Sequence, residues 1–189
     1  MNVRLDPVSL NNWEEVIKID LEPEQWANVD PPSVLHALCE GQFWPTFNSF
    51  VILDGDEQVG FVVHGIAPTD PAYWAVAILI VEKTHQHKGF GREAMTQVIA
   101  QAKAVEPPLK GIAISYRPGN IAAKALYTSL GFEPFLSDET DIHACLRFPA
   151  TAACARRRSP SSILKTSPPS KARSPAASMC RSAAQNTAR

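Results

Sequence analysis

The chain has 189 residues, of which 45% are hydrophobic, which suits one folded domain with an appendage. No apolar run reaches the length of a membrane span and the first residues lack the apolar stretch of a signal peptide, so neither feature is expected. The formal net charge of −1 hides an asymmetry, because residues 149–189 hold eight Lys/Arg and no acid. The other 10 basic and all 19 acidic residues lie in 1–148, a balance of −9. This acidic body would attract a cationic substrate, although an acidic soluble surface explains the charge equally well.

The cysteine and histidine patterns argue against a metal site. His85 and His87 have i, i+2 spacing with no further ligand nearby, so contact with phosphate or solvent is expected. No two cysteines form a Cys-x-x-Cys pair, which predicts reduced thiols in a cytoplasmic protein and no zinc site. The four are Cys39, Cys145, Cys154 and Cys180.

The N-terminal part of the chain contains two predicted helices and an aromatic cluster. A short strand is expected over 2–8 and a helix over 13–21, where apolar residues have helical spacing. Asp30 followed by two prolines predicts the start of a second helix, which Gly41 would end. Four aromatic residues in this part would either line a substrate pocket or cover the core, namely Trp26, Phe43, Trp44 and Phe47.

A β-hairpin is predicted next. Two apolar runs, 50–53 and 58–66, flank Asp54-Gly55, a dipeptide typical of hairpin turns. After a proline-containing loop, the run 75–81 has the length and β-branched content of a buried strand.

The polar loop after this strand has the features of an anion site. It contains Gly89 and Gly91 and leads into residues with helical spacing. The first turn of a helix offers unpaired N–H groups at the positive end of its dipole, and glycine lets the backbone approach a ligand closely. A phosphate or pyrophosphate is therefore expected here. Ala94 replaces the third glycine of a dinucleotide fingerprint, and no P-loop motif occurs.

The pattern then predicts a strand over 112–116 and a helix from Asn120 to Leu130, ended by Gly131. One side of this helix is expected to pack on the sheet through Ile121, Ala122, Ala125, Leu126 and Leu130. The opposite side would present Asn120, Ala123, Lys124 and Tyr127. Closing strands are predicted at 132–135 and 141–148.

Two motifs resemble the signatures of the GNAT acetyltransferases, which bind acetyl-CoA. Gln86-His87-Lys88-Gly89-Phe90-Gly91 is similar to the family's Gln/Arg-x-x-Gly-x-Gly/Ala loop. Asn120-x-x-Ala123-x-x-Leu126-Tyr127-x-x-Leu130-Gly131-Phe132 is similar to its second signature, and the elements between the two motifs fit the family's order. The resemblance covers residues 2–148. It implies an α/β fold with a mixed, mostly antiparallel sheet flanked by helices.

Within this family the chain looks most like the diamine and spermine/spermidine N-acetyltransferase group. Residues 82–91 resemble its acidic-x-x-aromatic-Gln-x-Lys-Gly-x-Gly loop, whereas Ala77 and Ile78 stand where that group usually has an acid and an arginine. The resemblance implies transfer of the acetyl group of acetyl-CoA to a primary amine, with a small polyamine or diamine as the leading acceptor. Protein or peptide N-acetylation and a non-catalytic acyl-CoA-binding module remain as alternatives.

The resemblance also implies roles for individual residues. The strand end would offer backbone groups to the pantetheine amides, and the loop would bind the pyrophosphate, helped by Lys88 and Arg92. Asn120 would hydrogen-bond the cofactor arm, and Tyr127 would protonate the leaving thiolate. The expected cofactor-binding residues are Leu79, Ile80, Val81, Gln86, His87, Lys88, Gly89, Phe90, Gly91, Arg92, Asn120, Ala123, Lys124 and Tyr127.

The sequence does not identify the general base that would deprotonate the amine. Glu82 at the strand end and His64 on the preceding strand are the first candidates, followed by Glu40 and Asp30. The expected partner is a small amine, with no membrane partner and no metal. A homodimer is compatible with the sequence.

Two regions are expected, an acetyltransferase domain over 1–148 and a basic low-complexity tail over 149–189. The tail is rich in Ala, Ser, Pro, Arg and Lys and has one isolated apolar pair, Ile163-Leu164, so it is predicted to be disordered. It is interpreted as an inert tail, as an electrostatic arm for nucleic acid or membrane, or as an out-of-frame translation of a gene end. Nucleic acid is disfavoured as a partner because the excess basic charge is confined to this tail.

Overall fold

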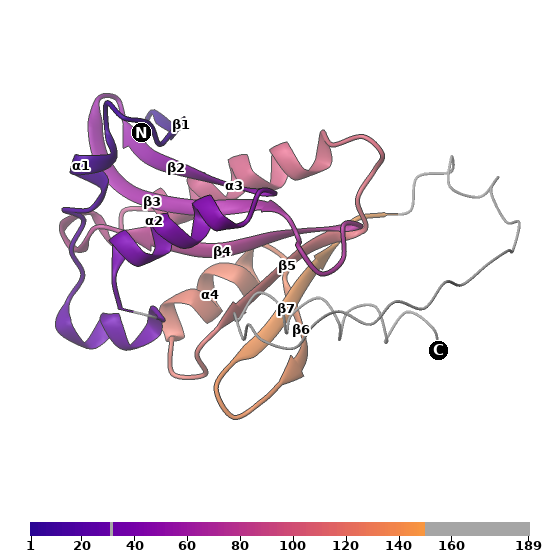
Figure 1. The fold of residues 1–189 in the computed structure, drawn as a ribbon. Coiled ribbons are helices and arrows are strands. Elements are labelled where there is room, and N and C mark those ends of the chain that lie inside the picture. The colour runs from indigo at the N-terminus through magenta and orange to yellow at the C-terminus, as the bar shows by residue number, and fades with distance from the viewer. Residues whose placement is uncertain (31, 150–189) are drawn as a thin grey trace, which may run out of the picture.

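The computed structural model describes residues 1–30 and 32–149, which build a seven-stranded sheet in the order β1-β2-β3-β4-β5-β7-β6 (Figure 1). The strands are β1 (Val3–Pro7), β2 (Phe47–Asp54), β3 (Glu57–Ile66), β4 (Tyr73–Val81), β5 (Gly111–Tyr116), β6 (Glu133–Ser137) and β7 (Ile142–Arg147). The α-helices are α1 (Trp13–Val16), α2 (Val34–Phe43), α3 (Phe90–Lys103) and α4 (Ile121–Ser129), and two 3-10 helices are η1 (Pro23–Asn28) and η2 (Lys83–His85). Only β4 and β5 pair in parallel, which confirms the predicted mostly antiparallel sheet flanked by helices.

Each face of the sheet is covered by helices. Successive residues of β3 point to opposite faces, as in any strand. Phe61 and Val63 belong to a core that includes Val16 of α1 and Val34 of α2. Val62 belongs to a second core, to which α3 and α4 contribute. The sheet is therefore a middle layer, with α1 and α2 on one side and α3 and α4 on the other (Figure 1).

The sheet opens between its two parallel strands. Pairing between β4 and β5 ends at Ala75 and Ala113, although β4 continues to Val81 and β5 to Tyr116. Near this point β4 has a bulge, because Ala77 is skipped between two consecutive partners in β3. A bulge bends and twists its strand. The strand ends beyond the bulge therefore leave a gap in the middle of the sheet.

The predicted limits of the second helix are wrong at both ends. The helix begins at Val34, where the Ser33 hydroxyl accepts a hydrogen bond from the His36 N–H at 3.2 Å. It does not stop at Gly41 but continues to Phe43. A Cβ on Gly41 would lie 2.7 Å from Ser49 Oγ, so this glycine allows α2 to pack closely on β2. The helix predicted over 13–21 is shorter than expected, since α1 ends at Val16.

The predicted orientation of α4 is wrong in part, because Leu126 and Leu130 pack inward as expected but the other predicted packing residues do not. Ile121 is 70% exposed, and Ala122 and Ala125 face solvent. Tyr127, expected on the outer side, is only 8% exposed and belongs to the core between the sheet, α3 and α4. The inward stripe has i, i+3, i+4, i+7 spacing. It consists of Ala123, Leu126, Tyr127 and Leu130.

Three of the four clustered aromatic residues cover the core on the α1 and α2 side. Phe47 is buried in it, and Trp26 and Trp44 are partly buried against it. Phe43 is 82% exposed. Core packing is thus the role that these positions favour.

The predicted tail lies outside the described residues except for Pro149. Cys154 and Cys180 belong to this tail and are also outside the described residues. Pro31, at the predicted start of the second helix, is not described either. Within the described ranges, no helix combines the length and the apolar character needed to cross a bilayer.

Candidate active site

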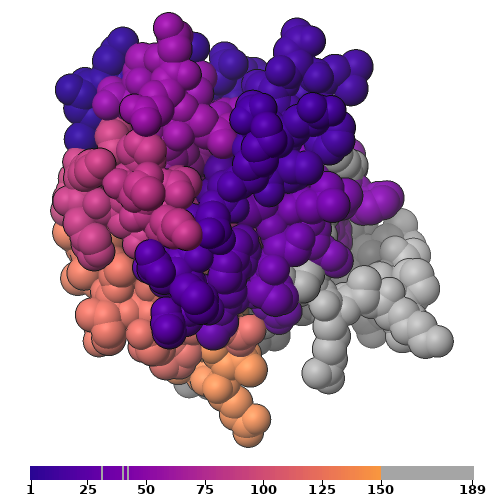
Figure 2. All heavy atoms as spheres, turned by 90° about the vertical axis from the view of Figure 1, so that its left-hand side faces the viewer, coloured from indigo at the N-terminus to yellow at the C-terminus, as the bar shows by residue number. Residues whose placement is uncertain are grey.

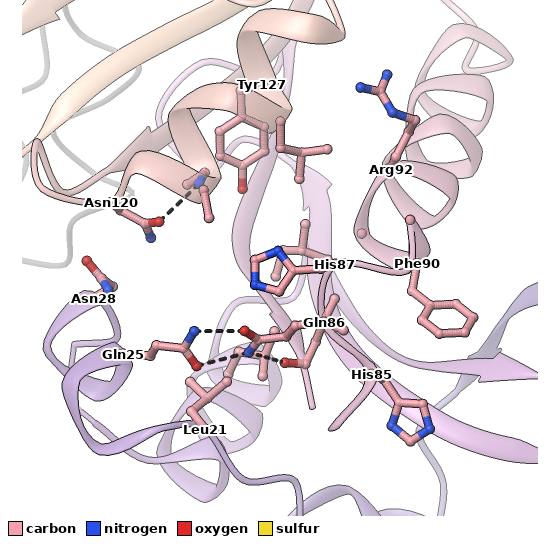
Figure 3. Close-up of a pocket in the computed structure, with 18 of the residues that line it drawn as sticks. Leu21, Gln25, Asn28, His85, Gln86, His87, Phe90, Arg92, Asn120 and Tyr127 are labelled. Carbon is pink, nitrogen blue, oxygen red and sulfur yellow. Dashed lines mark hydrogen bonds between the residues drawn. The ribbon is translucent and has the colours of Figure 1, made fainter. Parts of the chain in front are cut away.

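A cavity of about 360 Å³ lies beside the unpaired end of β4 (Figure 3). Four segments line it: residues 79–81 of β4, the loop and helix start at 85–92, the α4 side from Asn120 to Tyr127, and parts of 21–29 around η1. Segments far apart in the sequence therefore meet at the opening of the sheet. Figure 2 shows the molecule from this side, where the indigo segment that carries η1 lies next to the pink loop.

The loop that enters α3 presents backbone N–H groups. His87 has φ 61° and Gly89 has φ 93°, so two residues adopt the left-handed conformation that glycine tolerates best. Within the described part of the chain, the N–H groups from His87 to Gly91 donate no hydrogen bond to another protein atom. They stand at the N-terminus of a 14-residue helix, where the dipole is positive. This arrangement suits a pyrophosphate.

The side chains of this loop hold the walls of the cavity together. Gln86 and Gln25 of η1 bond through their amides in both directions, at 2.7 and 2.9 Å (Figure 3). Gln86 also donates to the Val81 carbonyl at 3.0 Å. On the other side, Arg92 donates to Ser129 Oγ at 2.6 Å and so joins α3 to α4. Gln86 and Arg92, which were both predicted to bind the cofactor, therefore line the cavity and also bridge its walls.

Two polar side chains of this segment face the cavity, Asn120 at the N-cap of α4 and Tyr127 within the helix. Asn120 Oδ1 caps the helix by accepting from the Ala123 N–H at 3.0 Å, which leaves its amide nitrogen for another partner. Figure 3 shows the Tyr127 hydroxyl pointing into the cavity. Its ring packs against Tyr116 and Phe132 at centroid distances of 5.8 and 5.6 Å. Burial, together with the neighbouring Tyr116, raises the pKa of Tyr127 to about 12. Tyr127 is therefore protonated at neutral pH and able to donate.

The structure brings twelve of the fourteen predicted cofactor-binding residues to this cavity. Lys88 and Lys124 are exposed and do not line it. The sequence did not single out the η1 side, to which Leu21, Gln25, Asn28 and Val29 contribute. A capping box joins Glu22 and Gln25, and this local signal could have revealed η1.

The two leading candidates for the base do not line the cavity. Glu82 caps η2 by accepting from the Thr84 N–H at 2.8 Å, and it also bonds the Thr84 hydroxyl and His85. Burial raises the pKa of Glu82, but these hydrogen bonds outweigh burial and leave it below its usual value. His64 is 1% exposed, stacks on Phe50 and accepts from Trp74 Nε1 at 3.2 Å. Because neither side chain lines the cavity and both are engaged in other contacts, their positions disfavour the role of general base.

His64 should instead make stability depend on pH. Burial lowers its pKa from 6.5 to about 4, so the folded state binds fewer protons than the unfolded state between these values. The contribution of neutral His64 to the free energy of unfolding is complete above the pKa of His64 in the unfolded state. It is lost as the pH falls through the pKa of His64 in the folded state. His64→Gln should therefore reduce the stability lost between about pH 7 and about pH 4 by up to about 3 kcal/mol. Urea unfolding across this range measures the effect, and parallel curves for both proteins would contradict it.

Comparisons with known proteins identify the family. A model of the acetyltransferase (GNAT) family matches residues 13–132. The chain belongs to this family. It is accordingly an acetyl-CoA-dependent N-acetyltransferase. No curated protein matches the chain.

Solved structures of acetyltransferases share the fold of this family member. An acetyltransferase from Thermus thermophilus is 18% identical with a TM-score of 0.63, covering 78% of this chain and 98% of its own. The ribosomal-protein-S18-alanine N-acetyltransferase from Escherichia coli is 16% identical with a TM-score of 0.61, covering 79% and 96%. Spermidine N-acetyltransferase from Vibrio cholerae, in complex with CoA and spermine, is 16% identical with a TM-score of 0.59, covering 76% and 93%.

The cavity can accommodate the donor of this family, acetyl-CoA. The N–H groups of the loop that lack an acceptor among the described residues are free to donate hydrogen bonds to a pyrophosphate. The unpaired edge of β4 at residues 79–81 is open to the amides of its pantetheine arm. Among the described residues, no three His, Cys, Asp or Glu side chains gather as ligands for a metal.

Proposed function

We propose that this acetyltransferase transfers the acetyl group of acetyl-CoA directly to a primary amine, with Tyr127 as the general acid. The observation that carries the proposal is the place of the Tyr127 hydroxyl. It is buried, protonated and directed into the same cavity as the anion-binding loop (Figure 3). Such a donor within hydrogen-bond reach of the leaving sulfur contributes about 10²–10⁴-fold to the rate.

The other lining residues would position the donor. The N–H groups of His87 to Gly91 would bind the pyrophosphate, and Arg92 would add positive charge. Residues 79–81 would pair with the pantetheine amides, and the amide nitrogen of Asn120 would donate to the same arm. The thioester would then lie near Tyr127, between the opened strands.

For the acceptor we propose a small polyamine or diamine. The balance of −9 in residues 1–148 supports a cationic substrate. Acidic side chains stand near one end of the cavity, where Asp30 and Asp141 both contact Arg117. The cavity itself is lined by no Asp or Glu among the described residues, which favours a monocation as the second candidate. The N-terminus of a protein or peptide is such an acceptor.

A panel of amines separates these acceptors. CoA release from acetyl-CoA is measured with spermidine, putrescine, a peptide with a free N-terminus and a peptide whose only amine is a lysine. The leading proposal predicts the highest kcat/KM with spermidine or putrescine. A higher value with the peptides would select protein acetylation. Acetyl-CoA binding without CoA release for any amine would indicate a non-catalytic binding module.

The two predicted loop cations should differ in their effect on donor binding. Arg92 lines the cavity, whereas Lys88 does not. Arg92→Ala removes a charge close to the proposed pyrophosphate and should raise the Kd of acetyl-CoA by about tenfold. Lys88→Ala, the matched control, should change it by about twofold. Calorimetric titration measures both, and equal Kd values for the two variants would argue against this role of Arg92.

A further inference from the structure

His143 of β7 is a buried histidine that the proposed chemistry has not used. It is 2% exposed, and its Nε2 lies 3.1 Å from Asp138 Oδ2. Its Nδ1 is buried without a partner among the described residues. A buried polar atom without a partner in a native protein calls for a water or a ligand. Nε2 of this imidazole is therefore held by Asp138, and Nδ1 is available to bind a water or a ligand.

Asp138 fixes which nitrogen carries the proton. Its carboxylate accepts from the N–H groups of Thr140 and Asp141 at 2.8 Å each. The hydrogen bond from His143, helped by these bonds, holds the pKa of Asp138 well below its usual value. A charged Asp138 requires Nε2 of His143 to donate. The neutral imidazole then presents a lone pair at Nδ1, as a base must.

His143 lies one strand away from the gap in the sheet. It pairs directly with Ser115 of β5, and β5 is the strand that parts from β4. Directly opposed residues project to the same face. Cys145, two residues along β7, belongs to the core on the α1 and α2 side, as does Phe135, whose ring centroid lies 6.4 Å from that of His143. His143 thus faces the side of the sheet opposite to α4 and Tyr127.

Charged contacts join the turn before β7 to the cavity. Arg117 lies 3.5 Å from Asp141 and 3.3 Å from Asp30. Asp30 directly follows Asn28 and Val29, which line the cavity. Arg117 lies shortly before Asn120, which also lines it. In Figure 3, Asn28 and Asn120 stand at the end of the cavity away from Phe90 and Arg92. In Figure 2 this orange turn emerges beside the indigo segment of η1.

We propose that His143, oriented by Asp138, takes up through a water the proton that the acceptor ammonium must lose. This inference rests on the proposed function. His85 and His87 line the cavity at its loop end. His64 lies on the α3 and α4 face of the sheet, opposite to the face of His143, where it stacks on Phe50. Of the two buried histidines in the described chain, His64 and His143, only His143 pairs an orienting carboxylate with an unbonded ring nitrogen.

The proton balance is complete with these groups. The ammonium gives one proton through water to His143 Nδ1, which later releases it to solvent. The neutral amine attacks the thioester carbonyl, so a C–N bond forms and the C–S bond breaks. The departing sulfur keeps the electron pair and takes the Tyr127 proton. The second proton of the amine restores Tyr127, and the products are the N-acetylamine and CoA thiol.

The test compares His143→Gln and Asp138→Asn with His64→Gln in the full chain. His64→Gln is the matched control, because it too removes a buried imidazole with one unbonded ring nitrogen, which is Nε2 in His64 and Nδ1 in His143. The probes are spermidine and trifluoroethylamine, a weakly basic amine that is mostly neutral at the assay pH. With spermidine, kcat/KM should fall about 10²-fold in His143→Gln and about tenfold in Asp138→Asn, with the Kd of acetyl-CoA unchanged. With trifluoroethylamine the loss should shrink below about fivefold, because little deprotonation is needed.

The pH profile gives a second readout. Asp138 is the charged group in contact with His143, and it is linked through the Asp141 N–H to the Asp141–Arg117 ion pair, so Asp138→Asn tests the direct contact. Wild-type kcat/KM should reach a plateau as the base loses its proton, whereas in His143→Gln it should keep rising with pH. Equal losses with both probes, or a loss no greater than in His64→Gln, would overturn the inference. Absence of CoA release by wild type with every amine would overturn the proposed function and this inference together.

Discussion

Replacing Tyr127 by phenylalanine is expected to lower the turnover of acetyl transfer by about 10²–10⁴-fold. The variant keeps the ring that packs between Tyr116 and Phe132 and loses only the hydroxyl directed into the cavity. Because burial keeps this hydroxyl protonated, its removal takes away a proton donor without adding or removing charge. The measurements are kcat by CoA release and the Kd of acetyl-CoA by titration, and the Kd should stay within about twofold.

Tyr116→Phe is the matched control for this experiment. Tyr116 is a buried tyrosine in contact with Tyr127, but it does not line the cavity. Its loss should change kcat by no more than about twofold. Full activity of Tyr127→Phe would refute the general-acid role. An equal loss in both variants would point to packing of the aromatic cluster.

Replacing Gly65 by alanine is expected to lower the free energy of unfolding by about 3 kcal/mol or more. Gly65 of β3 pairs with Phe47 of β2 and with Ala75 of β4. A Cβ at this position would lie 1.9 Å from the Thr46 carbonyl oxygen and 2.9 Å from the Cα of Phe47. Both atoms belong to the backbone, so relief of the clash requires β2 to move away from β3.

Gly119→Ala is the matched control for the strand variant, because a Cβ there would have no neighbour within 4 Å. It should leave stability within about 0.5 kcal/mol of wild type. Urea unfolding of the three proteins measures the difference. If Gly65→Ala were as stable as Gly119→Ala, the close approach of β2 and β3 would be wrong.

The central elements of the fold could be predicted because their signals are local. The apolar run at 75–81 and the hairpin dipeptide Asp54-Gly55 both correspond to observed elements. The loop before α3 was recognisable because its glycines and helix start are adjacent in the sequence. The motif on α4 added the Asn120 cap and Tyr127, which the fold brings to the same cavity.

Other features depend on contacts between distant residues and carry no local signal. Ala123, Leu126 and Tyr127 face inward although Ile121 is more apolar than Ala123, because the surrounding core decides which side of a short helix is buried. The Gln25–Gln86 pair joins residues 61 positions apart. The contact between His143 and Asp138 spans only 5 positions, but it forms because the turn between β6 and β7 folds back on the strand, and no sequence pattern indicated that turn.

The most direct test of this account is a crystal structure of the protein with bound CoA. We expect the pyrophosphate on the N–H groups of His87 to Gly91, the pantetheine arm along residues 79–81, and the sulfur within about 3–4 Å of the Tyr127 hydroxyl. CoA bound elsewhere, or a sulfur atom out of hydrogen-bond reach of Tyr127, would contradict both the site and the mechanism.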